Sequence, residues 1–220
     1  MKLERKFGED VEGYSIPVLN EREVRAAAGL FFVVLLVAAT QVIDKQNFAM
    51  LKYSIVFFLF DFILRVLVNP RYAPSMILGR LLVKNQTPEY VGAPQKKFAW
   101  IIGLFLATVM FVHMVILNGY SPITGFSCMF CLIFLFFESA FGICLGCKVY
   151  HLVYKTKALY CPGEVCEIKS RKEIQKVSGA QILIVLGSVL FMVLVGVMHH
   201  ENLQKKPYDI FGLESHTQTK

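Results

Sequence analysis

Charged residues are scarce in this chain of 220 residues: only 18% are Asp, Glu, Lys or Arg, while 55% are hydrophobic. A soluble domain carries about 25% charged residues, and the mean hydropathy here is positive at +0.54. The absence of a heptad pattern excludes a coiled coil, and 15 Gly and 8 Pro are too few for a low-complexity chain. The apolar content excludes intrinsic disorder. The composition therefore excludes an ordinary soluble enzyme and favours a membrane protein.

Five long apolar runs account for this composition. At about 1.5 Å per residue, a helix of about 20 residues matches a hydrocarbon core of about 30 Å and satisfies its own backbone hydrogen bonds there. No small-residue cleavage site follows the first run, so we expect the first helix to remain as an anchor. The sequence predicts an all-α, multi-pass transmembrane helix bundle within residues 26–200. Its five predicted spans are 26–43, 49–68, 98–117, 126–149 and 179–198.

Positive residues are distributed unevenly among the connections. The N-terminal tail and the second and fourth connections hold 5, 6 and 7 Lys or Arg, 18 in all. The first and third connections and the C-terminal tail hold 2, 0 and 3, only 5 in all. Because cytoplasmic loops retain positive charge, we expect tail 1–25 and loop 150–178 in the cytoplasm and tail 201–220 outside. The net charge of +7 is then explained by basic residues that face the anionic headgroups of the lipid bilayer. We therefore expect no nucleic-acid partner.

The second connection carries an amphipathic pattern of its own. Between Pro74 and Lys84, apolar residues surround Arg80. This pattern is typical of a short helix that lies in the headgroup plane. We expect the side chains of Arg80 and Lys84 to extend toward the cytosolic phosphates.

Six cysteines fall within a segment of 39 residues, from position 128 to position 166. The predicted topology places the first pair near the outer end of the fourth helix, the second near its inner end and the third in the cytoplasmic loop. A stable structural disulfide is therefore expected for the first pair alone, if for any. Residues 131 and 144 would lie about 20 Å apart on nearly opposite faces of one helix, so they could not exchange directly. The pairs are Cys128-x-x-Cys131, Cys144-x-x-Cys147 and Cys161-x4-Cys166.

Three interpretations of the inner four cysteines remain open. They could carry out thiol chemistry, in which one thiolate attacks and its neighbour resolves the adduct. They could bind a structural zinc ion, because their spacing suits a tetrahedral four-thiolate shell. They could also pack as small apolar residues between helices. The C-terminal helix end expected for Cys144 and Cys147 would raise their pKa, whereas nearby Lys148 would act in the opposite sense. We prefer thiol chemistry to zinc.

Ionisable residues within the apolar runs form a second set of candidates, because each is costly in lipid and should face protein. Asp61 and Arg65 are four residues apart, and their default interpretation is a mutual ion pair. Glu138 shares a helix face with Cys131, and it would pair with His113 or Arg65 or accept a proton. His113 is more often a packing residue than a ligand.

Several segments resemble the bacterial integral-membrane family called domain of unknown function 4395. The similarity extends over about residues 17–154, and its most specific element is Gly-x-Cys-x-Gly-Cys at 142–147. The resemblance implies a multi-pass bacterial membrane protein whose relatives often have thioredoxin-like or sulfur-transfer neighbours, and it implies no established activity. The other matching segments are 18–26, Asp61-x3-Arg65 with 69–71, 97–99 and the Cys161-Pro-Gly-x-x-Cys166 extension.

The resulting hypothesis is a bacterial inner-membrane protein that exchanges thiols, disulfides or sulfane sulfur at its cytoplasmic face. Cys144 and Cys147 would be the reactive pair, and Cys161 and Cys166 the partner pair. A thioredoxin-like or sulfurtransferase protein would be the partner, and no cofactor is required. The alternative is a non-enzymatic protein, either a small transporter that uses Glu138 and Asp61 or a scaffold in which the inner four cysteines bind zinc.

Overall fold

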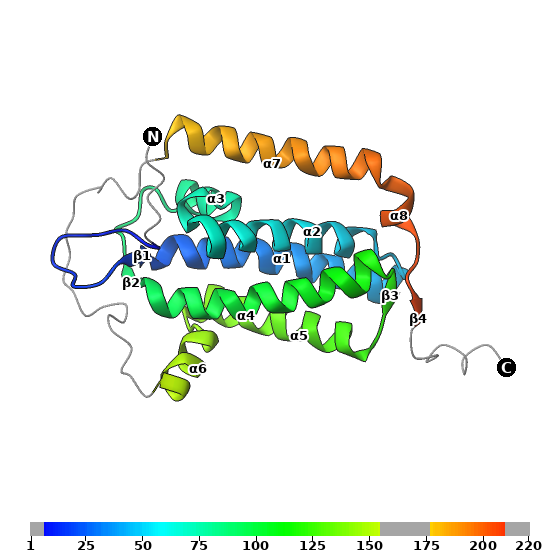
Figure 1. Ribbon diagram of the computed structural model, residues 1–220, viewed down its shortest axis with the longest axis horizontal. Helices are drawn as coiled ribbons and strands as arrows, with labels where there is room; N and C mark the ends of the chain where they lie inside the picture. The colour runs from blue at the N-terminus through cyan, green and yellow to red at the C-terminus, as the bar shows by residue number, and fades with distance from the viewer. Residues whose placement is uncertain (1–6, 155–176, 210–220) are drawn as a thin grey trace.

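Helices make up most of the computed structural model, which describes residues 7–154 and 177–209. The long helices α1, α2, α4 and α5 form a bundle, and α7 lies along one side of it (Figure 1). The helices are α1 (Glu21–Lys45), α2 (Ala49–Ile63), α3 (Pro74–Leu82), α4 (Ala93–Phe111), α5 (Pro122–Phe136), α6 (Leu145–Tyr154), α7 (Gly179–Met198) and α8 (His200–Gln204).

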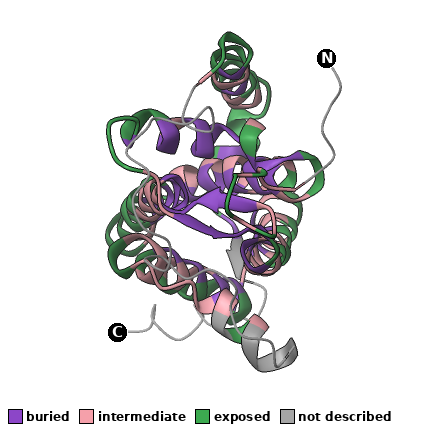
Figure 2. Ribbon diagram, turned by 90° about the vertical axis from the view of Figure 1, so that its left-hand side faces the viewer, coloured by how far each residue is buried: buried purple, intermediate pink, exposed green. Residues whose placement is uncertain are grey.

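Four helices in the described residues are long and apolar enough to cross a membrane: Glu21–Lys45, Ala93–Ile116, Pro122–Phe141 and Gly179–Met198. They leave large apolar side chains such as Phe105 uncovered on the outside of the bundle. Figure 2 shows the buried residues gathered at the centre of the bundle, with α7 at the top largely exposed. These features identify a membrane protein. The second predicted run, 49–68, is also helical, as α2 followed by a turn over Leu64–Val68. It differs from these four helices because it contains Lys52, Asp61 and Arg65.

Three of the bundle helices end in a wider, π-helical turn. These segments are η1 (Leu64–Val68) after α2, η3 (Val112–Ile116) after α4 and η4 (Phe137–Phe141) after α5. Each contains one ionisable residue of the apolar runs: Arg65, His113 and Glu138 respectively. Since π-helical turns occur frequently at functional sites, they draw attention to these residues.

The predicted continuous fourth span 126–149 is wrong in its second half. The helix ends at Phe141, and Gly142 adopts a left-handed conformation with φ of 65°. A new helix, α6, then begins at Leu145 and diverges from α5 (Figure 1). The local apolar composition hides this break, because hydropathy does not report the backbone conformation of a glycine.

The expected short helix in the second connection is present as α3, but the expectation for Arg80 is wrong. A short 3₁₀ turn, η2 (Pro70–Tyr72), precedes α3, which packs against α1 so closely that a Cβ on Gly79 would lie 2.6 Å from the Glu23 carbonyl oxygen. Arg80 is buried, and its Nε donates to Glu23 Oε2 at 3.0 Å. Lys84 is exposed. A nearby carboxylate in the protein interior thus holds Arg80 away from the headgroups.

Two small sheets, not predicted from the sequence, lie at opposite ends of the bundle (Figure 1). At one end β1 (Val18–Asn20) pairs antiparallel with β2 (Tyr90–Gly92). At the other end β3 (Gly119–Tyr120) pairs parallel with β4 (Tyr208–Asp209). The buried Lys52 reinforces the second end, because its Nζ donates to Asn118 Oδ1 at 2.5 Å and to the Lys205 carbonyl at 2.6 Å.

Candidate functional site

A buried charge cluster lies at the β1–β2 end of the bundle. Lys96, in the first turns of α4, donates to Glu21 Oε1 at 3.0 Å and also pairs with Glu138 of η4. Lys96 and Glu21 are each only 1% exposed. Glu138 therefore pairs with Lys96, and the expectation of His113 or Arg65 as its partner is wrong. One buried ammonium thus holds together α1, α4 and the end of α5.

The predicted Asp61–Arg65 ion pair is confirmed. Arg65 Nε lies 2.7 Å from Asp61 Oδ2, and both side chains are almost completely buried. Asp61 also accepts from the backbone N–H of Ser75 at 2.8 Å and from the Ser75 hydroxyl. Since Ser75 lies in the first turn of α3, the Asp61 carboxylate also satisfies a free N–H at that helix end.

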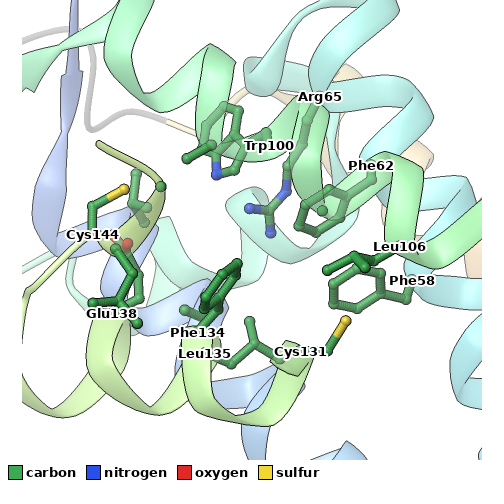
Figure 3. Close-up of a pocket in the computed structure, with 16 residues that line it drawn as sticks. Phe58, Phe62, Arg65, Trp100, Leu106, Cys131, Phe134, Leu135, Glu138 and Cys144 are labelled. Atoms are coloured by element: carbon green, nitrogen blue, oxygen red, sulfur yellow. The ribbon is translucent and has the colours of Figure 1, made fainter. Parts of the chain in front are cut away.

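A cavity of about 60 Å³ lies between these two charged groups. The Arg65 guanidinium points into it and lies 4.8 Å and 5.1 Å from the ring centroids of Phe62 and Trp100. Glu138 and Cys144 form the opposite side of the cavity (Figure 3). The remaining walls are mainly apolar, so the cavity combines aromatic surfaces, one cation, one carboxylate and the two thiols of Cys131 and Cys144.

The thiol of Cys144 lies at the start of a helix, not at the end of one. Cys144 directly precedes α6, and its Sγ accepts from the backbone N–H of Cys147 at 3.2 Å. This is the hydrogen bond of a helix N-cap. The expected placement of the pair at a C-terminal helix end is therefore wrong, because the chain breaks at Gly142. The positive end of a helix dipole favours the thiolate form of a nearby cysteine.

The two glycines of the Gly-x-Cys-x-Gly-Cys segment have separate structural roles. Gly142 has a positive φ, and the guanidinium of Arg25 packs against it. Gly146 allows α6 to approach α4, because a Cβ there would lie 2.5 Å from Ala99 Cβ. Together they turn the chain and bring Cys144 and Cys147 against the α4 turn that carries Lys96.

Opposing influences act on the Cys144 thiol. The neighbouring Cys147 thiol and burial raise the pKa of Cys144 above its ordinary value, whereas the Lys96 ammonium lowers it. The resting group is therefore a protonated thiol, and a negative charge formed on it would be stabilised by Lys96 and by the helix N-terminus.

The first cysteine pair lines a second, smaller cavity further along the bundle. Cys128 and Cys131 contribute to this space of about 20 Å³, which is otherwise lined by aliphatic and aromatic residues, including Phe58 and Met110. Cys131 and Phe58 also line the first cavity. Cys131 and Cys144 thus face the same cavity, and the expectation of opposite faces of one helix is wrong. All four described cysteines are free thiols.

The third pair, Cys161 and Cys166, lies outside the described residues. Within residues 7–154 and 177–209, no group of three or more His, Cys, Asp or Glu is arranged to hold a metal ion. The zinc interpretation requires the third pair, so it stays a prediction. The Nδ1 atom of His113 is buried and has no hydrogen-bond partner among the described residues.

The comparison with known families is decisive for the classification of the chain. The model of the family described as "Domain of unknown function (DUF4395)" matches residues 19–155, more than half of the chain. The chain belongs to this family. The matched region includes α1–α6 and therefore the charge cluster, both cavities and the Cys144–Cys147 pair. No curated protein and no solved structure matches the chain.

Sequence reasoning found Asp61, Arg65, Glu138 and the cysteines but missed the residues that join them. By sequence Lys96 precedes the third apolar run and so belongs to the charges of the second connection, and Glu21 belongs to the N-terminal tail. A usable signal was present, since both charges lie within one helical turn or so of an apolar run. Their pairing spans 75 residues, so no local pattern could have revealed it.

Proposed function

We propose that the chain spans a bacterial inner membrane five times, with α2 and η1 as the additional span, the N-terminus in the cytoplasm and the C-terminus outside. Two observations support this topology. The β1–β2 pair and the start of α6 lie at one end of the bundle, whereas α8 and β4 lie at the other (Figure 1). The end that carries β1 and α6 also corresponds to the connections with 18 of the 23 Lys and Arg residues.

This topology predicts the location of reporter fusions. A reporter fused after Lys220 is expected to be active outside the cytoplasm, because the C-terminal tail follows a fifth span. The same reporter inserted after Lys157 is expected to be active in the cytoplasm. A cytoplasmic C-terminus would contradict the five-span topology and would move the Cys144–Cys147 pair to the outer face.

We further propose that the chain carries out thiol–disulfide exchange or sulfane-sulfur transfer at its cytoplasmic face, with Cys144 and Cys147 as the reactive pair. The observation that carries the proposal is the position of Cys144 at the N-cap of α6, with its Sγ bonded to the N–H of Cys147. A Cys-x-x-Cys pair at a helix N-terminus has an attacking and a resolving thiol in adjacent turns.

The proposed exchange conserves atoms and electrons. Cys144 loses its proton to the Glu138 carboxylate, which lines the same cavity, and its thiolate attacks a disulfide of a thioredoxin-like partner. The partner disulfide breaks, a mixed disulfide forms, and one partner thiolate leaves. Cys147 gives its proton to the partner thiolate that has left, attacks Cys144 Sγ and releases the second partner thiolate. Two electrons pass from the protein dithiol to the partner, and Lys96 stabilises the transient Cys144 thiolate.

Thiol trapping under native conditions tests this proposal. When the protein is prepared without reductant, alkylated and analysed by mass spectrometry, we expect Cys144 or Cys147 in a disulfide with Cys161 or Cys166 or as a persulfide, or the Cys144–Cys147 disulfide that the exchange itself produces. Cys147→Ser should accumulate a mixed adduct on Cys144. Cys128→Ser is the matched control, because it removes one cysteine of the other Cys-x-x-Cys pair and should leave this adduct pattern unchanged.

Other results would favour the competing interpretations. One bound zinc ion per chain, with thiols that resist alkylation until a chelator is added, would support a metal scaffold. Four freely alkylated inner thiols without metal would leave packing as their role. Either result would refute the exchange proposal.

A further inference from the structure

The two cavities share lining residues and form a row that reaches three of the four described cysteines. Cys144 lines the first cavity, Cys128 lines the second, and Cys131 and Phe58 line both. The nine-tenths-buried thiol of Cys131 thus lies where the two spaces adjoin. Sulfur atoms therefore line the row along its length.

The size of the row restricts what it can hold. Its volumes are about 60 Å³ and 20 Å³, whereas a cavity that binds benzene measures about 150 Å³. A water molecule needs roughly 10–15 Å³ of such volume. The row therefore excludes peptides, glutathione and aromatic rings and admits molecules of one or a few heavy atoms.

The lining favours a soft, weakly hydrated guest. A buried water needs two to four polar partners, and the second cavity offers only thiols and apolar side chains, including Met110. Sulfur makes favourable contacts with aromatic rings such as that of Phe58. A molecule of about the size of water that contains sulfur suits these walls better than water does.

The first cavity adds one polar contact. Arg65 is 2% exposed, its hydrogen bonds to Asp61 and Ser75 use Nε and Nη2, and the guanidinium points into the cavity (Figure 3). It can therefore donate a further hydrogen bond to a guest. Asp61 already balances the positive charge of Arg65. The site therefore suits a neutral molecule or a small, weakly basic anion.

We propose that this row is a binding site for inorganic sulfide, as hydrogen sulfide or hydrosulfide, and that sulfide bound there attacks the oxidised Cys144–Cys147 pair. This inference rests on the exchange function proposed above and specifies its substrate. Hydrosulfide adds to Cys144 Sγ, and the Cys144–Cys147 disulfide bond breaks. Cys144 becomes a persulfide and Cys147 leaves as a thiolate, so the sulfide sulfur is oxidised and the disulfide is its oxidant.

The test compares two nucleophiles that attack the same disulfide. The full chain with Cys161 and Cys166 replaced by Ser is purified in detergent and oxidised with diamide. Its disulfide is then reacted with sodium sulfide or with reduced glutathione, which is too large for the row. Mass spectrometry after alkylation gives both rates. Their ratio is the measured quantity, because a general disturbance of the fold changes both rates together.

Filling the row should lower this ratio. Cys131→Leu adds bulk where the cavities adjoin, and Ala28→Val adds less bulk to the first cavity. We expect each variant to reduce the ratio of the sulfide rate to the glutathione rate by about tenfold or more. Met129→Leu is the control, since Met129 lies on the same helix but is 46% exposed on its outer face, and its ratio should stay within roughly twofold of the parent.

The outcomes separate the two proposals. If the disulfide forms and reacts but both filling variants keep the parent ratio, sulfide reaches Cys144 from the cytoplasmic face and the cavity inference is wrong. If diamide produces no Cys144–Cys147 disulfide, the exchange function itself fails, and the sulfide site fails with it.

Discussion

Replacement of Lys96 by Met is expected to lower the free energy of unfolding by about 3 to 5 kcal/mol, the cost of removing one member of a buried charge group. Lys96 lies between Glu21 and Glu138, and the Lys96 and Glu21 side chains are only 1% exposed. Without the ammonium, two neighbouring carboxylates remain in the protein interior and repel each other. Denaturant titration in detergent micelles measures the loss.

The adjacent Lys97 provides a matched control. Lys97→Met removes the same charge one residue further along α4, where the side chain is half-buried and its Nζ lies 5.0 Å from the Phe7 ring centroid. We expect this variant to cost about 0.5 to 1 kcal/mol. Adding Glu21→Gln to Lys96→Met should recover part of the larger loss. Equal losses for Lys96→Met and Lys97→Met would show that water reaches the cluster and solvates the two carboxylates, which would contradict a dry charge group.

Asp61→Ala should have the second large effect, also about 3 to 5 kcal/mol if the site is dry. The change leaves Arg65 buried without its counter-charge and removes the acceptor of the Ser75 N–H at the start of α3. Thermal unfolding in detergent measures the change. Asp44→Ala serves as the control, because Asp44 is an exposed acid near the end of α1 and its loss should cost less than about 0.5 kcal/mol.

A double-mutant cycle decides whether the two residues act together. Asp61→Asn combined with Arg65→Gln should be less damaging than the sum of the two single changes, because the double variant buries no unpaired charge. If the two effects simply add, Asp61 and Arg65 do not interact. Asp61 would then be a candidate for a proton or transport path, as in the alternative function.

The cysteine pair shows most clearly why sequence reasoning was limited. The spacing of Cys144 and Cys147 identified them as a unit, but their electrostatic environment was predicted with the wrong sign. One continuous helix placed them at its negative end, whereas the break at Gly142 places Cys144 at the positive end of α6. Gly142 itself was the only sign of this break in the sequence, but glycine also occurs within intact membrane helices, so its presence does not predict a break.

Local patterns were sufficient for the membrane character, four of the helices and the Asp61–Arg65 pair. Hydropathy over about 20 residues reports the medium around a helix, and an i,i+4 spacing fixes two side chains on one helix face. The tertiary structure decided which residues meet across the bundle. Glu138 pairs with Lys96, 42 residues away, and Arg80 turns inward to Glu23, 57 residues away. A buried charge takes whichever opposite charge the packed helices bring within reach, and that choice depends on helix packing rather than on the sequence near either residue.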